Sequence, residues 1–223
     1  MNNPGMLLIL KFFALTYSAL LPVINPIGSA LMFLTIVGSV PAEQFRYLAR
    51  KVAISMVLFL LVFEVAGAAL LKFFGISLPV VQLAGGVVLA AMGWRMLDQD
   101  QGANGQSTPP VRDIATLDQE IFFPLTFPIS AGPACIVVTL TLSAHASRHD
   151  LFSNVLGHVG MALGIVALGV TIWLCYLYAS RITQKIARTT IQGILRVVAF
   201  VLLCIGVQIA SNGLEAIVKA VPK

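Results

Sequence analysis

Charged residues are scarce in this sequence: Asp, Glu, Lys and Arg together make up 10% of 223 residues. A typical soluble domain has about 25% charged residues, so a soluble globular protein of ordinary composition is excluded. Hydrophobic residues make up 58% of the chain, and the mean hydropathy is +0.94. The sequence therefore indicates an all-helical protein that spans a lipid bilayer several times.

Motifs of energy-driven or hydrolytic chemistry are also missing. The sequence has no Gly-rich phosphate loop, no nucleotide-binding domain and no recognisable pair of nucleophile and base. We therefore expect neither an ATP-driven pump nor an intramembrane hydrolase, and we expect no cofactor. The protein is predicted not to be an enzyme.

Candidate metal ligands are few. The three cysteines have no metal-binding spacing and lie in apolar segments, where we interpret them as packing residues: Cys135, Cys175 and Cys204. His145 and His149 could bind a metal only with Asp150 as a third ligand. We therefore favour a pair of histidines at the membrane interface without a metal. No metal site is predicted.

The positive charges are spread along the chain. The 14 Lys and Arg residues are scattered at the ends of apolar segments, which argues against nucleic acid as a partner. Nine of them share a membrane side with residues 45–51 and five lie on the other side. The positive-inside rule then predicts both termini on the outer side of the membrane, which is the periplasm if the protein lies in a bacterial inner membrane. The residues before the first apolar run, Asn2, Asn3 and Pro4, do not resemble a signal peptide, so we expect the first span to stay in the mature protein.

Continuous apolar runs predict six transmembrane helices, at about 6–37, 48–73, 78–97, 121–144, 151–180 and 191–218. Between the third and the fourth lies a polar segment rich in Gly, Pro and acidic residues, 98–120, which we interpret as a flexible cytoplasmic linker. It divides the chain into two three-helix units, 1–97 and 121–223.

Prolines and glycines interrupt the first and fourth predicted helices. The first break is Pro22-Val-Ile-Asn25-Pro26-Ile-Gly28-Ser29, and the second is Pro128-Ile-Ser130-Ala131-Gly132-Pro133-Ala134. Proline removes a backbone donor and glycine adds freedom, so each segment should unwind its helix. Simple kinks are the alternative. Two broken helices at corresponding places point to the binding site of a transporter.

The two halves align through these breaks. Pro22 lies over Pro128 at an offset of 106, and Gly93 lies over Gly206 at an offset of 113. The excess of seven residues is placed in the loop 181–190. A unit that crosses the membrane three times ends on the opposite side, so a tandem copy must be inverted. The sequence therefore predicts two inverted three-helix repeats.

The broken segments suit a small zwitterionic ligand. A half-helix that starts within the membrane offers backbone N–H groups to a carboxylate, and the carbonyl groups that end the preceding half-helix suit an ammonium group. The candidate substrate-binding residues supply polar groups and space for a small ligand: Asn25, Pro26, Gly28, Ser29, Ser130, Ala131, Gly132, Pro133 and Ala134.

Other polar or small residues lie within the apolar segments. Glu64 is an ionisable group within the second span and is either an ion-coupling residue or a protonated, hydrogen-bonded structural residue. Gln208 and Asn212 share one helix face, where interhelical hydrogen bonding is favoured over substrate contact. Gly160 and Gly164 permit close helix approach, either inside the bundle or between subunits. The oligomeric state is left open.

Four sequence runs together resemble the MarC family of six-span bacterial and archaeal membrane proteins. They are Asn25-Pro-Ile-Gly28, Phe74-Gly-Ile-Ser-Leu-Pro79 with Ala84-Gly-Gly86, Pro124-Leu-Thr-Phe-Pro128 with Ala131-Gly-Pro133, and Gly206-Val-Gln208 with Asn212-Gly213. The resemblance covers the whole chain. It implies a neutral amino acid transporter for substrates such as glycine and alanine, with its pocket at residues 25–29 and 130–134. At Ala134 the family often has glycine, and the added methyl group could narrow that pocket.

The leading hypothesis is a secondary transporter of small neutral amino acids. It would work by alternating access around a site near the membrane midplane, between the two inverted repeats. The alternatives are an exporter of other small metabolites or drugs on the same scaffold, and a membrane protein without transport activity that supports or regulates a partner.

Overall fold

The computed structural model describes residues 4–38, 40–98, 118–146, 150–179 and 188–220, and these are all helical or turn segments without a strand. The elements are α1 (Pro4–Ile24), α2 (Pro26–Val37), α3 (Ala42–Phe73), α4 (Leu78–Asp98), η1 (Ile121–Ser130), α6 (Pro133–Ala146), α7 (Leu151–Leu177) and α9 (Arg188–Ala220). Most of the predicted linker, 99–117, and most of the loop 181–190 lie outside the described residues.

Five of the described helices are long and apolar enough to cross a bilayer: α1, α3, α4, α7 and α9. The bent pair formed by η1 and α6, whose axes differ by 66°, gives a sixth candidate span. The predicted span positions agree with these elements. The second span starts earlier than predicted, because α3 begins at Ala42, directly after the N-cap residue Pro41.

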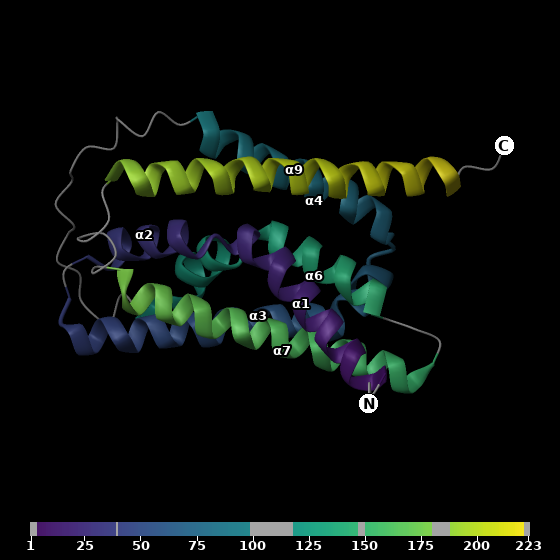
Figure 1. The fold of residues 1–223 in the computed structure, drawn as a ribbon, viewed down its shortest axis with the longest axis horizontal. Coiled ribbons are helices and arrows are strands. Elements are labelled where there is room, and N and C mark those ends of the chain that lie inside the picture. Colours follow the sequence, from purple (N-terminus) through teal and green to yellow (C-terminus); the bar gives the residue numbers. More distant parts are fainter. Residues whose placement is uncertain (1–3, 39, 99–117, 147–149, 180–187, 221–223) are drawn as a thin grey trace.

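The helices form two groups (Figure 1). α3 and α7 lie side by side with α1 packed against α7, whereas α4 and α9 pack closely against each other. The start of α1 and the end of α9 lie toward the same end of the long axis, as an even number of crossings requires.

A single apolar core links the larger group. It includes residues from α1, α2, α3, η1, α6 and α7, among them Leu20, Phe33, Met56, Leu125 and Ile165. A smaller cluster of Leu89, Ala134 and Leu202, with Val23 packed against it, joins the α4–α9 pair to the rest. The boundary between the two groups therefore passes through residues next to both predicted breaks.

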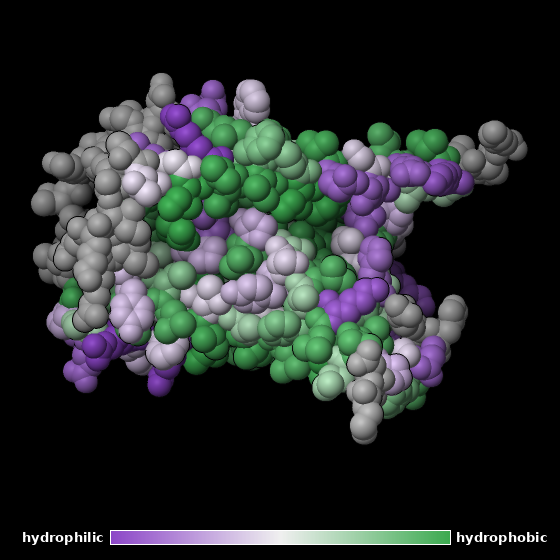
Figure 2. All heavy atoms as spheres, viewed as in Figure 1, coloured by the Kyte–Doolittle hydropathy of each residue, from purple (hydrophilic) through white to green (hydrophobic). Residues whose placement is uncertain are grey.

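The surface is apolar over much of its area. Side chains such as Leu58, Val62 and Val65 on α3 are 58%, 55% and 77% exposed. In Figure 2 hydrophobic residues cover much of the middle of the visible face, and hydrophilic residues gather mainly toward the two ends. Helices this apolar on the outside are suited to lipid rather than water.

Glycines set the closest helix contacts. A Cβ atom on Gly160 would lie 2.5 Å from the backbone oxygen of Ile9, and one on Gly164 would lie 3.0 Å from Cβ of Thr16. The Gly160–Gly164 motif thus packs α7 against α1 inside the bundle, which answers the question that the sequence left open.

Candidate functional site

Asn25 separates α1 from α2. Its backbone is left-handed, with φ 48° and ψ 70°, a conformation that asparagine adopts more readily than most residues. Its side-chain oxygen accepts a hydrogen bond from the N–H of Gly28 at 3.2 Å, and its backbone oxygen accepts from the N–H of Ser29 at 2.9 Å. Asn25 is therefore the N-cap of α2, a role that the sequence analysis did not assign to it.

This cap changes one detail of the predicted site. Free N–H groups at the start of the second half-helix were expected to receive a ligand carboxylate. The N–H groups of Gly28 and Ser29 are already bonded to Asn25. A carboxylate could reach the N–H of Gly28 only by displacing the Asn25 side chain.

A prediction follows from the cap. Asn25→Ala loses both the capping oxygen and the residue type suited to φ 48°, whereas Asn25→Gly loses only the oxygen and keeps the backbone conformation. Replacing an N-cap residue by alanine costs about 1 kcal/mol, and replacing it by glycine only a few tenths. Thermal unfolding in detergent should rank wild type first, Asn25→Gly second and Asn25→Ala last; equal melting temperatures for the two variants would contradict the cap.

The second predicted break lies between η1 and α6. Phe123 and Phe127, each directly before a proline, have extended backbone conformations inside η1, as the residue before a proline prefers. Side-chain hydroxyl groups bond to carbonyl groups five residues earlier: Thr126 Oγ1 donates to the oxygen of Ile121 and Ser130 Oγ to that of Leu125, both at 2.7 Å. η1 thus ends in a polar, internally bonded turn at Ser130.

Tyr176 of α7 brings the two segments together. Its hydroxyl group lies 2.7 Å from Ser130 Oγ. Both residues are buried, and the Tyr176 ring stacks on Phe33 of α2 with centroids 4.4 Å apart. One phenol therefore connects a residue of the second predicted break with α2, the helix that follows the first.

The residues around this contact are small and tightly packed. Ser29, Ser130, Ala131 and Ala134 are at most 4% exposed, and Gly132 is also buried. Asn25, Pro26 and Gly28 are half-buried, and Pro133 is exposed. In this conformation a ligand at the breaks would need the surrounding helices to move apart.

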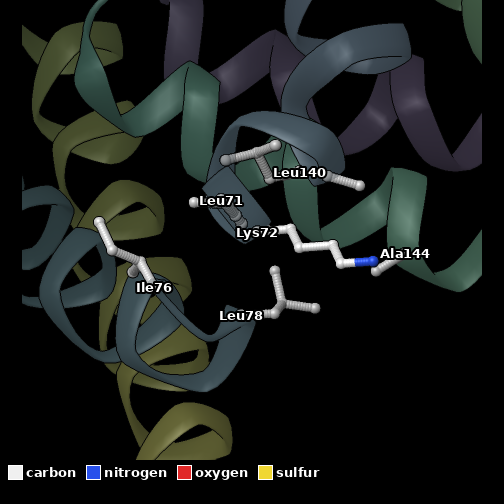
Figure 3. Close-up of a pocket in the computed structure, with 7 residues that line it drawn as sticks. Leu71, Lys72, Ile76, Leu78, Leu140 and Ala144 are labelled. Atoms are coloured by element: carbon white, nitrogen blue, oxygen red, sulfur yellow. The ribbon is translucent and has the colours of Figure 1, made fainter. Parts of the chain in front are cut away.

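A pocket of about 220 Å³ lies at a different place, between the end of α3, the start of α4 and α6 (Figure 3). Its wall is mostly apolar, with Leu71, Leu78 and Leu140 among the lining residues, and Lys72 is its one charged side chain. No residue of the predicted binding segments lines it.

Glu64 is buried at 2% exposure and contacts His158 of α7, with 2.5 Å between Oε1 and Nδ1. The sequence analysis singled out Glu64 but missed His158. The same signal, an ionisable residue within an apolar run, could have found it.

The remaining polar candidates do not join a site in the described chain. Gln208 donates a hydrogen bond to Asn212 at 2.9 Å on an exposed face of α9, so the expected bond between helices is replaced by one within a helix. His145 Nδ1 lies 2.7 Å from the oxygen of Thr141 in its own helix, and His149 is outside the described residues. Among the residues that the structure describes, no three side chains are grouped as a metal would require.

Comparison with known proteins gives the family. The chain matches the description "MarC family integral membrane protein" over residues 10–218. It is 31% identical over 206 residues to a UPF0056 membrane protein of Methanocaldococcus jannaschii, a match that covers 92% of this chain and 97% of the relative. It is 27% identical over 213 residues to the UPF0056 inner membrane protein MarC of Salmonella paratyphi A, covering 94% and 96%. No solved structure is significantly similar to it. The apolar helical bundle and these matches together show that the chain belongs to the MarC family of integral membrane proteins.

Proposed function

We propose that this protein is a secondary transporter of small neutral amino acids of the glycine and alanine class. The contacts of Tyr176 with Ser130 and with Phe33 of α2 carry the proposal. They join the end of η1 to the helix that follows the first interruption at one buried place, where a small zwitterion could replace the phenol as the partner of Ser130. The first and fourth spans act as broken helices in this proposal.

The packing of α4 on α9 supports inverted repeats. A Cβ atom on Gly93 would lie 2.6 Å from the nitrogen of Leu203 and 2.8 Å from the oxygen of Ala199. A Cβ atom on Gly206 would lie 2.3 Å from the nitrogen of Ala90 and 2.7 Å from the oxygen of Gly86.

These contacts are equivalent under one shift along the sequence. Adding 113 to Gly93 gives Gly206, and adding 113 to residues 86 and 90 gives 199 and 203. The same three positions in each helix therefore face each other through the same backbone atoms. An approximate twofold axis between α4 and α9, perpendicular to both helices, has this property, and inverted repeats would be related by such an axis.

Alternating access follows from the two helix groups. The boundary between the α4–α9 pair and the rest passes Val23 and Ala134, next to the two breaks. Movement of one group against the other would open the buried site first to one side and then to the other. In this proposal both termini face the periplasm, and the site lies near the membrane midplane.

The proposal is tested in proteoliposomes loaded with unlabelled glycine or alanine. External labelled glycine should accumulate transiently by exchange, because a carrier exposes its site to each side in turn, and protein-free liposomes should show none. Exchange of other small metabolites without glycine or alanine would favour an exporter on the same scaffold. Folded protein that exchanges none of these solutes would overturn transport and favour a supporting or regulatory membrane protein.

A further inference from the structure

Three helices meet at one buried ionisable pair. Glu64 of α3 is 2% exposed and His158 of α7 is 27% exposed, and their Oε1 and Nδ1 atoms are 2.5 Å apart. From α6, Ser143 Oγ donates a hydrogen bond of 2.9 Å to the backbone oxygen of Glu64. The pair thus lies where α3, α6 and α7 pack together.

The short contact requires a proton between the two groups. A carboxylate facing an imidazole nitrogen without a proton would repel it, so the pair holds at least one proton. It is either a carboxylate with a neutral imidazole that donates from Nδ1 or, with one proton more, a carboxylate with an imidazolium or a carboxylic acid with a neutral imidazole. The form with the additional proton is neutral overall, which suits a site within an apolar bundle. The pair can therefore bind and release one proton as a unit.

Among the described residues, few other charged groups lie near the pair. Around Glu64, α6 carries His145, whose Nδ1 faces its own helix at Thr141, and η1 carries no ionisable side chain between Ile121 and Ser130. Hydrogen bonds from the side chain and backbone of Ser153 lower the pKa of Asp150, the exposed N-cap of α7. On α3 itself, Lys72 lies two turns from Glu64, and on α1 Lys11 is exposed.

A pocket and one polar atom lie within a helical turn of the pair. Ala68, one turn from Glu64 on the same face of α3, lines the pocket of Figure 3, and the exposed residues Lys72 and Ile76 also line it. On α7, one turn before His158, the side-chain oxygen of Asn154 is buried with no hydrogen-bond partner among the described residues. A water molecule bonded to this oxygen could carry a proton toward the imidazole.

The pair is also connected to the proposed binding site. Ser143, whose hydroxyl group donates to the backbone oxygen of Glu64, belongs to α6. This helix begins at Pro133, at the second break. Ten residues of helix separate these two positions, or about 15 Å. A change in the contacts of Glu64 therefore acts on the helix whose first turn forms part of that site.

The geometry points to Glu64 and His158 as a proton-binding site that couples proton movement to transport. This inference rests on the proposed transport function. One proton enters the pair from one side of the membrane, travels with the substrate through the conformational change, and leaves to the other side. When the proton binds, an O–H or N–H bond forms at the pair as the bond of the proton to its donor water breaks, and release reverses this exchange; no other covalent bond changes.

Transport under a pH gradient tests the coupling. A gradient of one pH unit is worth about 1.4 kcal/mol per proton, enough for roughly tenfold accumulation of glycine if one proton moves with each molecule. Wild type and Glu43→Gln, a change at an exposed residue of the first turn of α3, should both reach this accumulation. Glu64→Gln should still exchange glycine but should not accumulate it, because an amide can form a hydrogen bond with His158 but does not take up a proton near neutral pH. His158→Gln provides the second variant and should also lose accumulation. Tenfold accumulation by folded Glu64→Gln would overturn the inference.

An infrared titration separates the two proposals, because it needs no substrate. All nine Asp and Glu residues contribute to the carboxylic acid absorption that disappears as the pH rises, so the band of Glu64 is the component that wild type and Glu43→Gln share and that Glu64→Gln lacks. Identical titrations for wild type and Glu64→Gln would overturn the proton site, even if glycine is transported. If wild type carries no amino acid but shows the band, the transport proposal and its coupling fail, while proton binding at Glu64 stands.

Discussion

Gly206→Val should prevent α4 and α9 from packing and leave little folded protein. Even the first added carbon would lie 2.3 Å from the nitrogen of Ala90 and 2.7 Å from the oxygen of Gly86. Both atoms are backbone, so no side chain can rotate away and the helices must separate. Overpacking in a well-packed interior costs about 1 to 3 kcal/mol and occasionally more, and we expect the upper part of this range because α4 and α9 contact each other along much of their lengths (Figure 1).

Gly193→Val in the same helix is the matched control. No atom of the described residues lies within 4 Å of a Cβ atom at Gly193, so valine there should leave folding unchanged. The measurement is the fraction of monodisperse protein after detergent extraction, together with its melting temperature. Equal yields and melting temperatures for the two variants would show that α4 and α9 do not approach as closely as the structure has them.

The membrane spans could be predicted from sequence because each is a local property. An apolar run of about 20 residues needs no partner to be recognised, whereas the start of α3 after Pro41 lies before its apolar run and was not predicted. The contact between α4 and α9 was harder to predict from sequence, since it depends on which faces of the two helices meet. Gly93 and Gly206 suggested a repeat through their spacing, but not that each faces the backbone of the other helix.

The candidate site was predicted in part. The segments that contain Ser29 and Ser130 were identified from sequence, because proline and glycine within apolar runs can be recognised without knowledge of the fold. Tyr176 was missed because tyrosine near the end of a span ordinarily marks the membrane interface. Only the three-dimensional packing shows that its hydroxyl group meets Ser130 while its ring stacks on Phe33 of α2.

The capping of α2 shows a different limit. A proline after Asn25 predicted an interrupted helix, and the interruption leaves N–H groups without helical partners. Whether such N–H groups remain available to a ligand or bond to a nearby side chain depends on the conformation of one residue. Here the left-handed conformation of Asn25 turns its side chain back to Gly28.

Gly28→Val and Gly132→Val should each strongly weaken glycine binding. A Cβ atom on Gly28 would lie 2.4 Å from Nδ2 of Asn25, and one on Gly132 would lie 3.1 Å from the oxygen of Pro128. The first change displaces the capping side chain, and the second crowds the turn between η1 and α6. Both add two further methyl groups at positions that the proposed ligand would occupy. A penalty of about 1 to 3 kcal/mol at one position corresponds to a loss of affinity of roughly 5- to 150-fold.

Met32→Val serves as the control for Gly28→Val, because Met32 is 58% exposed on the same helix, α2. Binding of labelled glycine to purified protein and the melting temperature without ligand should be measured together for all three variants. Binding should fall much more than thermal stability in the two glycine variants, since the Asn25 side chain can rotate and the Pro128 carbonyl needs to shift by only a few tenths of an ångström. Normal glycine binding by both glycine variants would mean that the ligand lies elsewhere, because neither break could hold it beside a valine. The pocket beside Lys72 would then be the next candidate for the glycine-binding site.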